Sequence, residues 1–312
     1  GYDALTANTT GGYNVAVGRN ALAANTTASH NIGVRYLALT ANTTGAYNTA
    51  IGSACLDANT TGSDNTAIGR GALSSATTAI DNTAVGKSAL VSNTTGTKNV
   101  GIGVSALATQ TTESDNTAIG WHALKANTTG AYNTAVGYLS LTANTTANHN
   151  TALGYDAAKN ITTGASNTAL GSEAIKEATT GDHNTAAGYR ALNALTTGDD
   201  NTAIGSNALY VNTTGYSNVG IGNSALKTIT NHTDNTAVGY LALATATASK
   251  NTAVGSKALT ANTTGDNNVA VGRDALIGNT TGGNNTALGY SALEANTTGA
   301  VSYTHLTLPT KA

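Results

Sequence analysis

Histidine and aspartate side chains recur in one column of this sequence, and they are its first candidates for metal chemistry. His30, His149 and His183 each stand directly before an Asn, but no two of them lie in neighbouring repeats, so they do not suit one shared metal ion. Asp64 and Asp81 do fall in neighbouring repeats, where a pair of carboxylates could hold Ca²⁺. Solvated turn residues explain all five more simply, and the sequence predicts no metal site.

Motifs for catalysis are missing from the sequence. It contains no Gly-x-Ser-x-Gly elbow, phosphate-binding loop, paired-Cys motif or His-Glu-x-x-His. Charged residues make up 10% of the 312 residues, the net charge is −2, and there is no basic stripe suited to nucleic acid. No run of about 18 apolar residues predicts a transmembrane helix. We therefore expect no catalysis, no cofactor and no nucleic-acid partner.

A repeat of 17 residues organises the chain from Gly1 to about Ala300. A typical unit runs from Asn133 to His149 and reads Asn-Thr-Ala-Val-Gly, then Ser-Leu, then Asn-Thr-Thr. Its β-branched residues and Gly predict a short strand and a turn, and the glycines and Asn-Thr-Thr corners leave no uninterrupted stretch for a helix. One repeat, at 239–254, is a residue short. The units begin at Asn14, Asn31, Asn48, Asn65, Asn82, Asn99, Asn116, Asn133, Asn150, Asn167, Asn184, Asn201, Asn218, Asn235, Asn251, Asn268 and Asn285.

This pattern predicts an all-β fold, a parallel β-solenoid of about 17–18 coils with one repeat per coil, in residues 1–300. The Asn that opens each unit is expected to be a turn residue whose amide stacks from coil to coil. Cys55 replaces the Ala that precedes Leu in other units, so we expect a small buried filler. Asn42, Asn127 and Asn262 open Asn-Thr-Thr sequons, but the repeat itself accounts for them and we expect no glycosylation.

The middle residue of each predicted strand is always Ala or Gly. If its β-branched neighbours point into the core, the small residue points outward, and its uniform size indicates that something packs against it. The simplest partner is another copy of the chain around a symmetry axis. With the faces reversed, the β-branched pair would need that partner instead. The candidate interface residues are Ala50, Ala67, Ala84, Gly101, Ala118, Ala135, Ala152 and Ala169.

Aromatic residues recur directly after the Gly of the strand, and they are the best candidates for a binding surface. Aromatic rings supply contact area at a low cost in conformational entropy. The alternative is that each Tyr only covers the neighbouring coil. The candidate residues are Trp121, Tyr138, Tyr155, Tyr189 and Tyr240, together with His122 beside Trp121.

The pattern Asn-Thr-Ala-Val-Gly, found at 133–137 and 251–255, resembles the head repeats of trimeric autotransporter adhesins of the YadA-like type. It also resembles repeats of bacteriophage tail fibres. The resemblance implies a left-handed parallel β-roll, three chains side by side, and binding to a host or matrix macromolecule or a cell-surface glycan. It further implies an extracellular place on the bacterial surface, with membrane contact only through a C-terminal anchor that this sequence lacks. The adhesin repeats are shorter, and the extra residues here are expected in the Asn-Thr-Thr-Gly corner.

The leading hypothesis is therefore an extracellular structural and adhesive rod, and the alternative is a segment of a bacteriophage tail fibre that binds a host receptor. An ice-binding solenoid is a third hypothesis, based on the stacked Thr-Thr pairs. Adjacent Thr residues in a strand point to opposite sides, which argues against it. A polysaccharide-degrading solenoid ranks last, because the repeat supplies no cluster of acids.

The two ends of the sequence depart from the repeat. The chain starts at Gly1 without a Met or a signal segment, which predicts a fragment. Residues 301–312 break the pattern, and their back-translation resembles a transposase adaptor used in sequencing libraries. We interpret this segment as a non-native scar.

Overall fold

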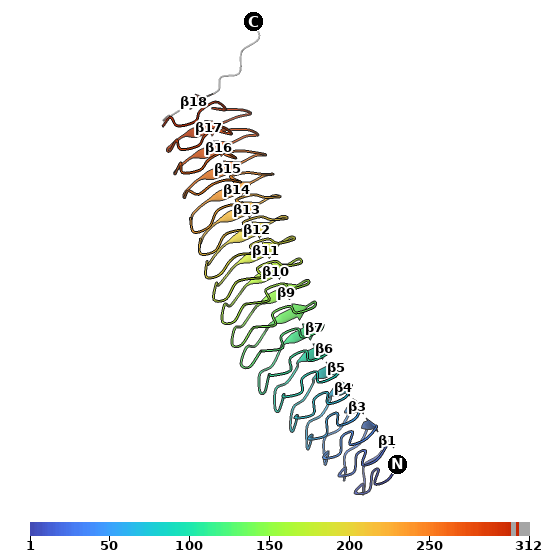
Figure 1. Cartoon of the computed structure of the whole chain (residues 1–312). Helices are drawn as coiled ribbons and strands as arrows, with labels where there is room; N and C mark the ends of the chain where they lie inside the picture. Colours follow the sequence, from blue (N-terminus) through green and yellow to red (C-terminus); the bar gives the residue numbers. More distant parts are fainter. Residues whose placement is uncertain (301–303, 306–312) are drawn as a thin grey trace. The chain divides into compact units, whose positions relative to one another are not determined.

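The computed structural model describes residues 1–300 and the short strand Thr304–His305. Its contacts divide the chain into two compact units, Gly1–Thr163 and Gly164–Ala312. Each unit is a stack of coils without helix among its described residues, and each is a parallel β-solenoid, as the repeat predicts (Figure 1). Of the predicted scar at 301–312, all but Thr304–His305 lies outside the described residues.

Each coil between residues 14 and 289 contributes one strand of three residues, which follows the Asn of the repeat and precedes its Gly, with Arg35 in place of that Gly in one coil. In the first unit the strands are β1 (Val15–Val17), β2 (Ile32–Val34), β3 (Thr49–Ile51), β4 (Thr66–Ile68), β5 (Thr83–Val85), β6 (Val100–Ile102), β7 (Thr117–Ile119), β8 (Thr134–Val136) and β9 (Thr151–Leu153). In the second unit they are β10 (Thr168–Leu170), β11 (Thr185–Ala187), β12 (Thr202–Ile204), β13 (Val219–Ile221), β14 (Thr236–Val238), β15 (Thr252–Val254), β16 (Val269–Val271), β17 (Thr286–Leu288) and the two-residue β18 (Thr304–His305).

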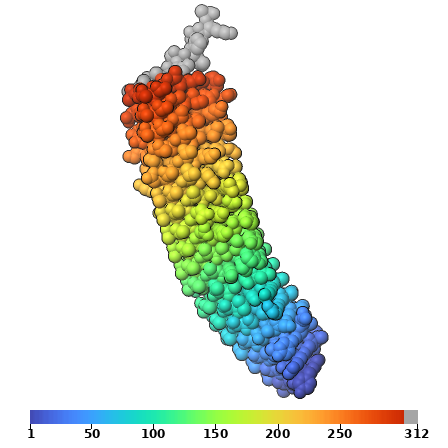
Figure 2. All heavy atoms as spheres, viewed as in Figure 1, coloured from blue at the N-terminus to red at the C-terminus, as the bar shows by residue number. Residues whose placement is uncertain are grey.

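Consecutive strands within a unit pair in parallel, with identical columns of the repeat in register. Thr66 lies beside Thr83 and Ala67 beside Ala84, a step of one full repeat. The step from β14 to β15 is a residue shorter, since Thr236 pairs with Thr252. The side chains of each column therefore form a rank along the stack, and successive coils pack directly on one another (Figure 2).

The middle residue of each strand points into the coil, and its β-branched neighbours point outward. Ile51 and Ile119, for example, are 39% and 37% exposed. The first assignment of faces from the sequence is therefore wrong, and the reversed assignment holds. The eight candidate interface residues are all buried inside their own coils, so they cannot form a surface for another chain: Ala50, Ala67, Ala84, Gly101, Ala118, Ala135, Ala152 and Ala169.

The Leu of the repeat explains why the middle residue stays small. Leu39 and Leu90, like the Leu of most coils, are fully buried. A β-carbon added to Gly101 would stand only 3.1 Å from Leu90 Cγ. The Leu side chain thus fills the space behind the strand, and anything larger than Ala would displace it. The core is a rank of Leu packed against a rank of Ala and Gly, rather than the Val or Ile with Leu that the pattern suggested.

The turn after the strand uses left-handed backbone at residues that rarely adopt it. Leu39 has φ 52° and its N–H donates to the carbonyl of Cys55 in the next coil at 3.1 Å. Asn42 closes the turn by donating its N–H to the Leu39 carbonyl at 3.2 Å. At the end of the strand, Gly137 has φ 138°, and a β-carbon there would collide with the Gly154 carbonyl oxygen. The turn geometry accounts for the Gly column.

The Asn that opens each unit forms a buried ladder, as predicted. The N–H of Asn48 donates to Oδ1 of Asn31 at 2.9 Å, and the Asn48 side-chain amide donates to the Gly62 carbonyl at 2.8 Å. These side chains are fully buried and tie each coil to the next. Because a buried amide without partners costs free energy, this satisfied ladder specifies both the turn and the stacking.

The Asn-Thr-Thr corner carries a second buried ladder. Asn42 Nδ2 donates to Asn25 Oδ1 at 3.0 Å and to the Gly45 carbonyl at 2.9 Å. Gln110 replaces Asn at this column and still accepts from Asn127 Nδ2 at 3.1 Å. The sequon asparagines Asn42, Asn127 and Asn262 belong to this ladder and are fully buried. Their burial explains the sequon-like repeat in structural terms.

Candidate binding surfaces

Three aromatic rings of the first unit stack on one another in the turn that follows the strand. Trp121, Tyr138 and Tyr155 come after β7, β8 and β9, so the parallel register places them in one rank. The ring centroids of Trp121 and Tyr138 are 4.8 Å apart, and those of Tyr138 and Tyr155 are 5.4 Å apart, with interplanar angles of 8° and 4°. Stacking occupies faces of these rings, so the stack offers the ring edges and the Tyr hydroxyls to a ligand.

His122 adds a fourth ring to this stack. Its imidazole lies on the Trp121 ring, with centroids 3.4 Å apart and planes 19° apart. Desolvation, and secondly the nearby charge of Lys125, lower the pKa of His122 below its usual value. The lowered pKa favours the uncharged form of the imidazole, a polar group beside the indole.

Tyr189 and Tyr240 belong to the second unit. Neither has an aromatic residue at the same repeat position in the coil before or after it. Tyr189 lies under the guanidinium of Arg190, whose Cζ is 4.9 Å from the ring centroid. Arg190 Nε also donates to Glu173 Oε2 at 3.0 Å. The six candidate binding residues thus fall into one stacked group, Trp121 with His122, Tyr138 and Tyr155, and two separate tyrosines.

A second aromatic rank lies just before the strands, and the sequence pattern did not reveal it. His30 is held between Tyr13 and Tyr47, with centroid distances of 4.9 and 4.8 Å and interplanar angles of 11° and 4°. His149 stacks on Tyr132 in the same way at 5.1 Å. The signal is present in the sequence, since all five residues share the column before the Asn at the repeat spacing. His30 and His149 are thus stacking partners of tyrosines, whereas His183, in the same column, lies beside Asp200.

The residues considered for metal binding are spread over exposed turns. His183 Nδ1 is 4.0 Å from Asp200 Oδ1, and both side chains are largely exposed. Asp64 and Asp81 are exposed turn residues with φ 59°. Among the described residues, no group of three or more His, Cys, Asp or Glu could hold a metal ion.

The sheet face of each unit is the most extended surface feature. In the first unit the outward side chains of β1–β9 form two ranks, made only of Thr, Val, Ile and Leu. Many of these apolar side chains are exposed, including Val17 at 57% and Leu153 at 51%. No charged residue interrupts either rank in β1–β9. Scattered apolar residues are ordinary on protein surfaces, whereas a continuous uncharged strip of this kind is typical of interaction surfaces.

Comparison with known proteins identifies no family for the chain. No protein-family model matches the sequence, and no curated protein shows significant similarity to it. In the described part of the chain, no helix is long and apolar enough to cross a membrane. The chain is a parallel β-solenoid with coils of about 17 residues.

Proposed function

We propose that this protein is an extracellular structural and adhesive protein, assembled from three copies of the chain and similar to the heads of trimeric autotransporter adhesins. The single observation that carries the proposal is the uncharged, β-branched face of the solenoid. The repeat motif and its resemblance to adhesin heads supply the biological setting, on the outer surface of a bacterium. The protein has no catalytic role in this proposal.

The sheet face has the length that a stable interface needs. Nine strands spaced by about 4.8 Å give the first unit a strip roughly 38 Å long. Val and Ile side chains are stiff, so burying them costs little side-chain entropy, and each buried side chain contributes about 1.5–3 kcal/mol. A flat face repeated by a symmetry axis is the simplest way to cover such a strip, and three chains around the axis would enclose all of it.

The aromatic ranks border the sheet face, so in this proposal they lie along the seams between copies, and their outer ring edges supply the adhesive surface. Trp121, Tyr138 and Tyr155 present a row of ring edges and hydroxyls, with the imidazole of His122 beside them. Such mixed apolar and polar tips suit a host or matrix macromolecule or a cell-surface glycan. A bacteriophage tail fibre that binds a host receptor would use the same assembly and the same row, and it is the alternative within this class.

One observation favours a second candidate function, ice binding. The Thr of β3, β4 and β5 (Thr49, Thr66 and Thr83) points outward beside a rank of Ile and Val, which gives a regular two-dimensional array of hydroxyls and methyls. This array differs from the Thr-Thr corner that the sequence pattern suggested. It requires that the sheet face stay free in solution.

The solution mass of the full chain, measured by light scattering after size exclusion, tests the proposal. Three chains per particle support the trimeric adhesive protein, whereas a monomer at high concentration contradicts it. A thermal hysteresis measurement on the same sample separates the second candidate, since an ice-binding face must be free and active. Binding assays of the assembled protein against matrix proteins, glycans and bacterial cells then distinguish an adhesin from a tail fibre.

A further inference from the structure

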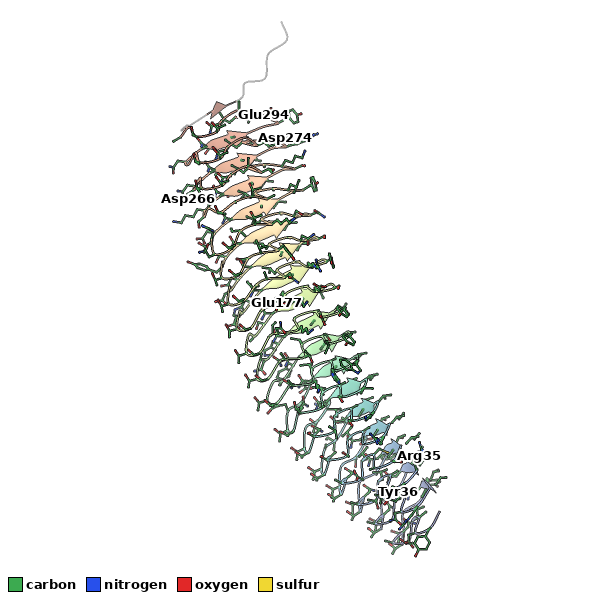
Figure 3. The ribbon with its side chains drawn as sticks, in the orientation of Figure 1. Arg35, Tyr36, Glu177, Asp266, Asp274 and Glu294 are labelled. Atoms are coloured by element: carbon green, nitrogen blue, oxygen red, sulfur yellow. The ribbon has the colours of Figure 1, made fainter. Side chains whose placement is uncertain are left out.

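Two rims border the sheet face of the solenoid. The leading rim consists of the second residue before each strand, and the trailing rim consists of the second residue after each strand. In the second unit the rim residues of β16 are Asn267 and Arg273, and Figure 3 labels their neighbours Asp266 and Asp274, which lie at opposite edges. In the first unit the leading rim is Tyr13, His30, Tyr47, Asp64, Asp81, Lys98, Asp115, Tyr132 and His149, and the trailing rim is Arg19, Tyr36, Ser53, Arg70, Lys87, Val104, Trp121, Tyr138 and Tyr155.

The charges on the two rims are opposite. In the first unit the leading rim carries three Asp and one Lys, while the trailing rim carries two Arg and one Lys and no acid. The opposite charges coincide on the same coils, because Asp64 and Arg70 flank β4 and Asp81 and Lys87 flank β5. No strand from β1 to β17 has like charges on both rims.

The four charges that flank β4 and β5 have no ion-pair partner among the described residues of their own chain. Asp64, Arg70, Asp81 and Lys87 are exposed, and none of them makes an ion pair among the described residues. Asp81 and Lys87 lie on opposite sides of β5 and make no ion pair with each other in the structure. The complementarity therefore points to a partner that presents the opposite rim, and another copy of this chain does so.

We propose that the leading rim of one copy meets the trailing rim of the next copy at the same coil level, and that the Asp64–Arg70 and Asp81–Lys87 pairs fix the axial register of the assembly. This inference rests on the proposed self-assembly through the sheet face. When parallel copies surround an axis with their sheet faces inward, each leading rim adjoins a neighbour's trailing rim. An antiparallel pair would instead bring two leading rims together and set carboxylates near carboxylates.

The rims also discriminate against a slipped register. A shift by one coil in one direction pairs Asp81 with Arg70 but brings Lys98 against Lys87, two like charges. A shift in the other direction pairs Asp64 with Lys87 but leaves Asp81 facing Val104, so each slipped register keeps only one ion pair. The unshifted register keeps both ion pairs and opposes no like charges. Since the β-branched ranks look alike at every level, the apolar face alone cannot select a register, and the rim charges supply the missing specificity.

Zero-length cross-linking of the full-length assembly tests the register directly. A carbodiimide activates a carboxylate, and a neighbouring lysine amine then displaces the activating group to form an amide. Mixing unlabelled and nitrogen-15-labelled chains before assembly identifies the links between copies by mass spectrometry. We expect an Asp81–Lys87 link between copies. A link from Asp64 to Lys87 would indicate a slipped register and overturn the inference.

Charge exchange gives the second readout, with light scattering and sedimentation as the measure of assembly. Lys87→Glu places two carboxylates together at each interface and should weaken association about tenfold or more. Combining it with Asp81→Lys should restore most of that loss. Lys227→Glu, the same charge change on an exposed turn of the second unit outside both rims, should leave assembly unchanged. Melting curves of each variant verify that the coils remain folded.

The outcomes separate this inference from the proposed function. A wild-type chain that stays monomeric overturns both. An assembly that forms but shows no Asp81–Lys87 link and no response to Lys87→Glu overturns the register alone, and the proposed assembly stands.

Discussion

The side chain of Leu22 lies against Gly33 of the next coil, so that a β-carbon on Gly33 would stand 3.2 Å from Leu22 Cγ. The same relationship joins Leu209 to Gly220 in the second unit, also at 3.2 Å. This contact between Leu and Gly shows which side of the strand faces the interior of the coil. The small residues of the strand are small because the Leu of the preceding coil occupies the space that a larger side chain would need.

Replacing Ala135 with Glu should unfold its coil rather than affect a surface. Ala135 is fully buried, and a carboxylate there would have neither room nor a partner. Burial of an unpaired charge and overpacking are among the few mechanisms that cost several kcal/mol, and we expect a loss of about 3 kcal/mol or more. Urea unfolding of the dilute protein measures this loss.

The neighbouring residue Val136 provides the matched comparison. Its side chain points outward, so Val136→Asp should leave the stability of a single dilute chain within about 1 kcal/mol of wild type while reducing self-association. If Val136→Asp destabilised the isolated coil as much as Ala135→Glu, the inward orientation of the strand's middle residue would be contradicted.

The period, the strand and the ladder of opening asparagines could be predicted because they depend on spacing alone. A column such as Asn31, Asn48 and Asn65 can recur at one interval only if the coils stack in register. The orientation of the strand could not be predicted, because Thr-Ala-Val alternates equally well with either side inward. The large side chains of Val and Ile were misleading, because they suggested that the β-branched residues of the strand fill the core.

The turn that places Leu in the core lies beyond sequence reasoning. Leu39 reaches the interior only because its backbone is left-handed, at φ 52°, a conformation that Leu rarely adopts. Among the binding candidates, the alignment of Trp121, Tyr138 and Tyr155 along the stack could be predicted from their 17-residue spacing. The stack of His30 with its two tyrosines was missed because the column mixes ring types with charges, so it does not look like an aromatic motif.

Replacing Ala76 with Asn should stabilise the first unit. Asn59 Oδ1 is buried without a hydrogen-bond partner, because the next coil carries Ala76 where the ladder would place an amide. A new amide there can donate to Asn59 and complete the ladder, for a gain of about 1 kcal/mol. Differential scanning calorimetry measures the gain. As a control, Ala89→Asn puts an amide into a buried position outside the ladder and should destabilise the unit.

The stability of the protein should fall between pH 9 and 12 because of Cys55. Burial raises the pKa of this thiol from its ordinary value of 9.0 to about 12. The unfolded chain therefore loses the thiol proton near pH 9 while the folded chain keeps it, so unfolding becomes more favourable as the pH rises through this window. Cys55→Ala removes this part of the pH dependence without changing the core, since Ala occupies the same column in Ala38 and Ala72.

Unfolding of both proteins in denaturant at pH 8 and pH 11 provides the measurement. The difference between wild type and Cys55→Ala should change with pH in favour of the variant. If the stabilities of wild type and Cys55→Ala changed equally with pH, burial would not suppress ionisation of the thiol.

The fluorescence of Trp121 should report the protonation of His122. Trp121 is the one tryptophan of the chain, and its ring lies 3.4 Å from the imidazole of His122, measured between centroids. A protonated imidazole quenches indole emission, so emission should fall as the pH drops through the pKa of His122. Desolvation and the charge of Lys125 lower that pKa, which places the midpoint below the usual 6.5.

Two variants identify the groups responsible for this transition. Lys125→Ala removes one of the two causes of the lowered pKa and should move the midpoint upward, whereas His122→Gln should abolish the transition. A midpoint at or above the ordinary value in the wild-type chain would mean that the imidazole stays solvated and does not lie on the indole. The stack of His122 on Trp121 would then lose its proposed place in the binding surface.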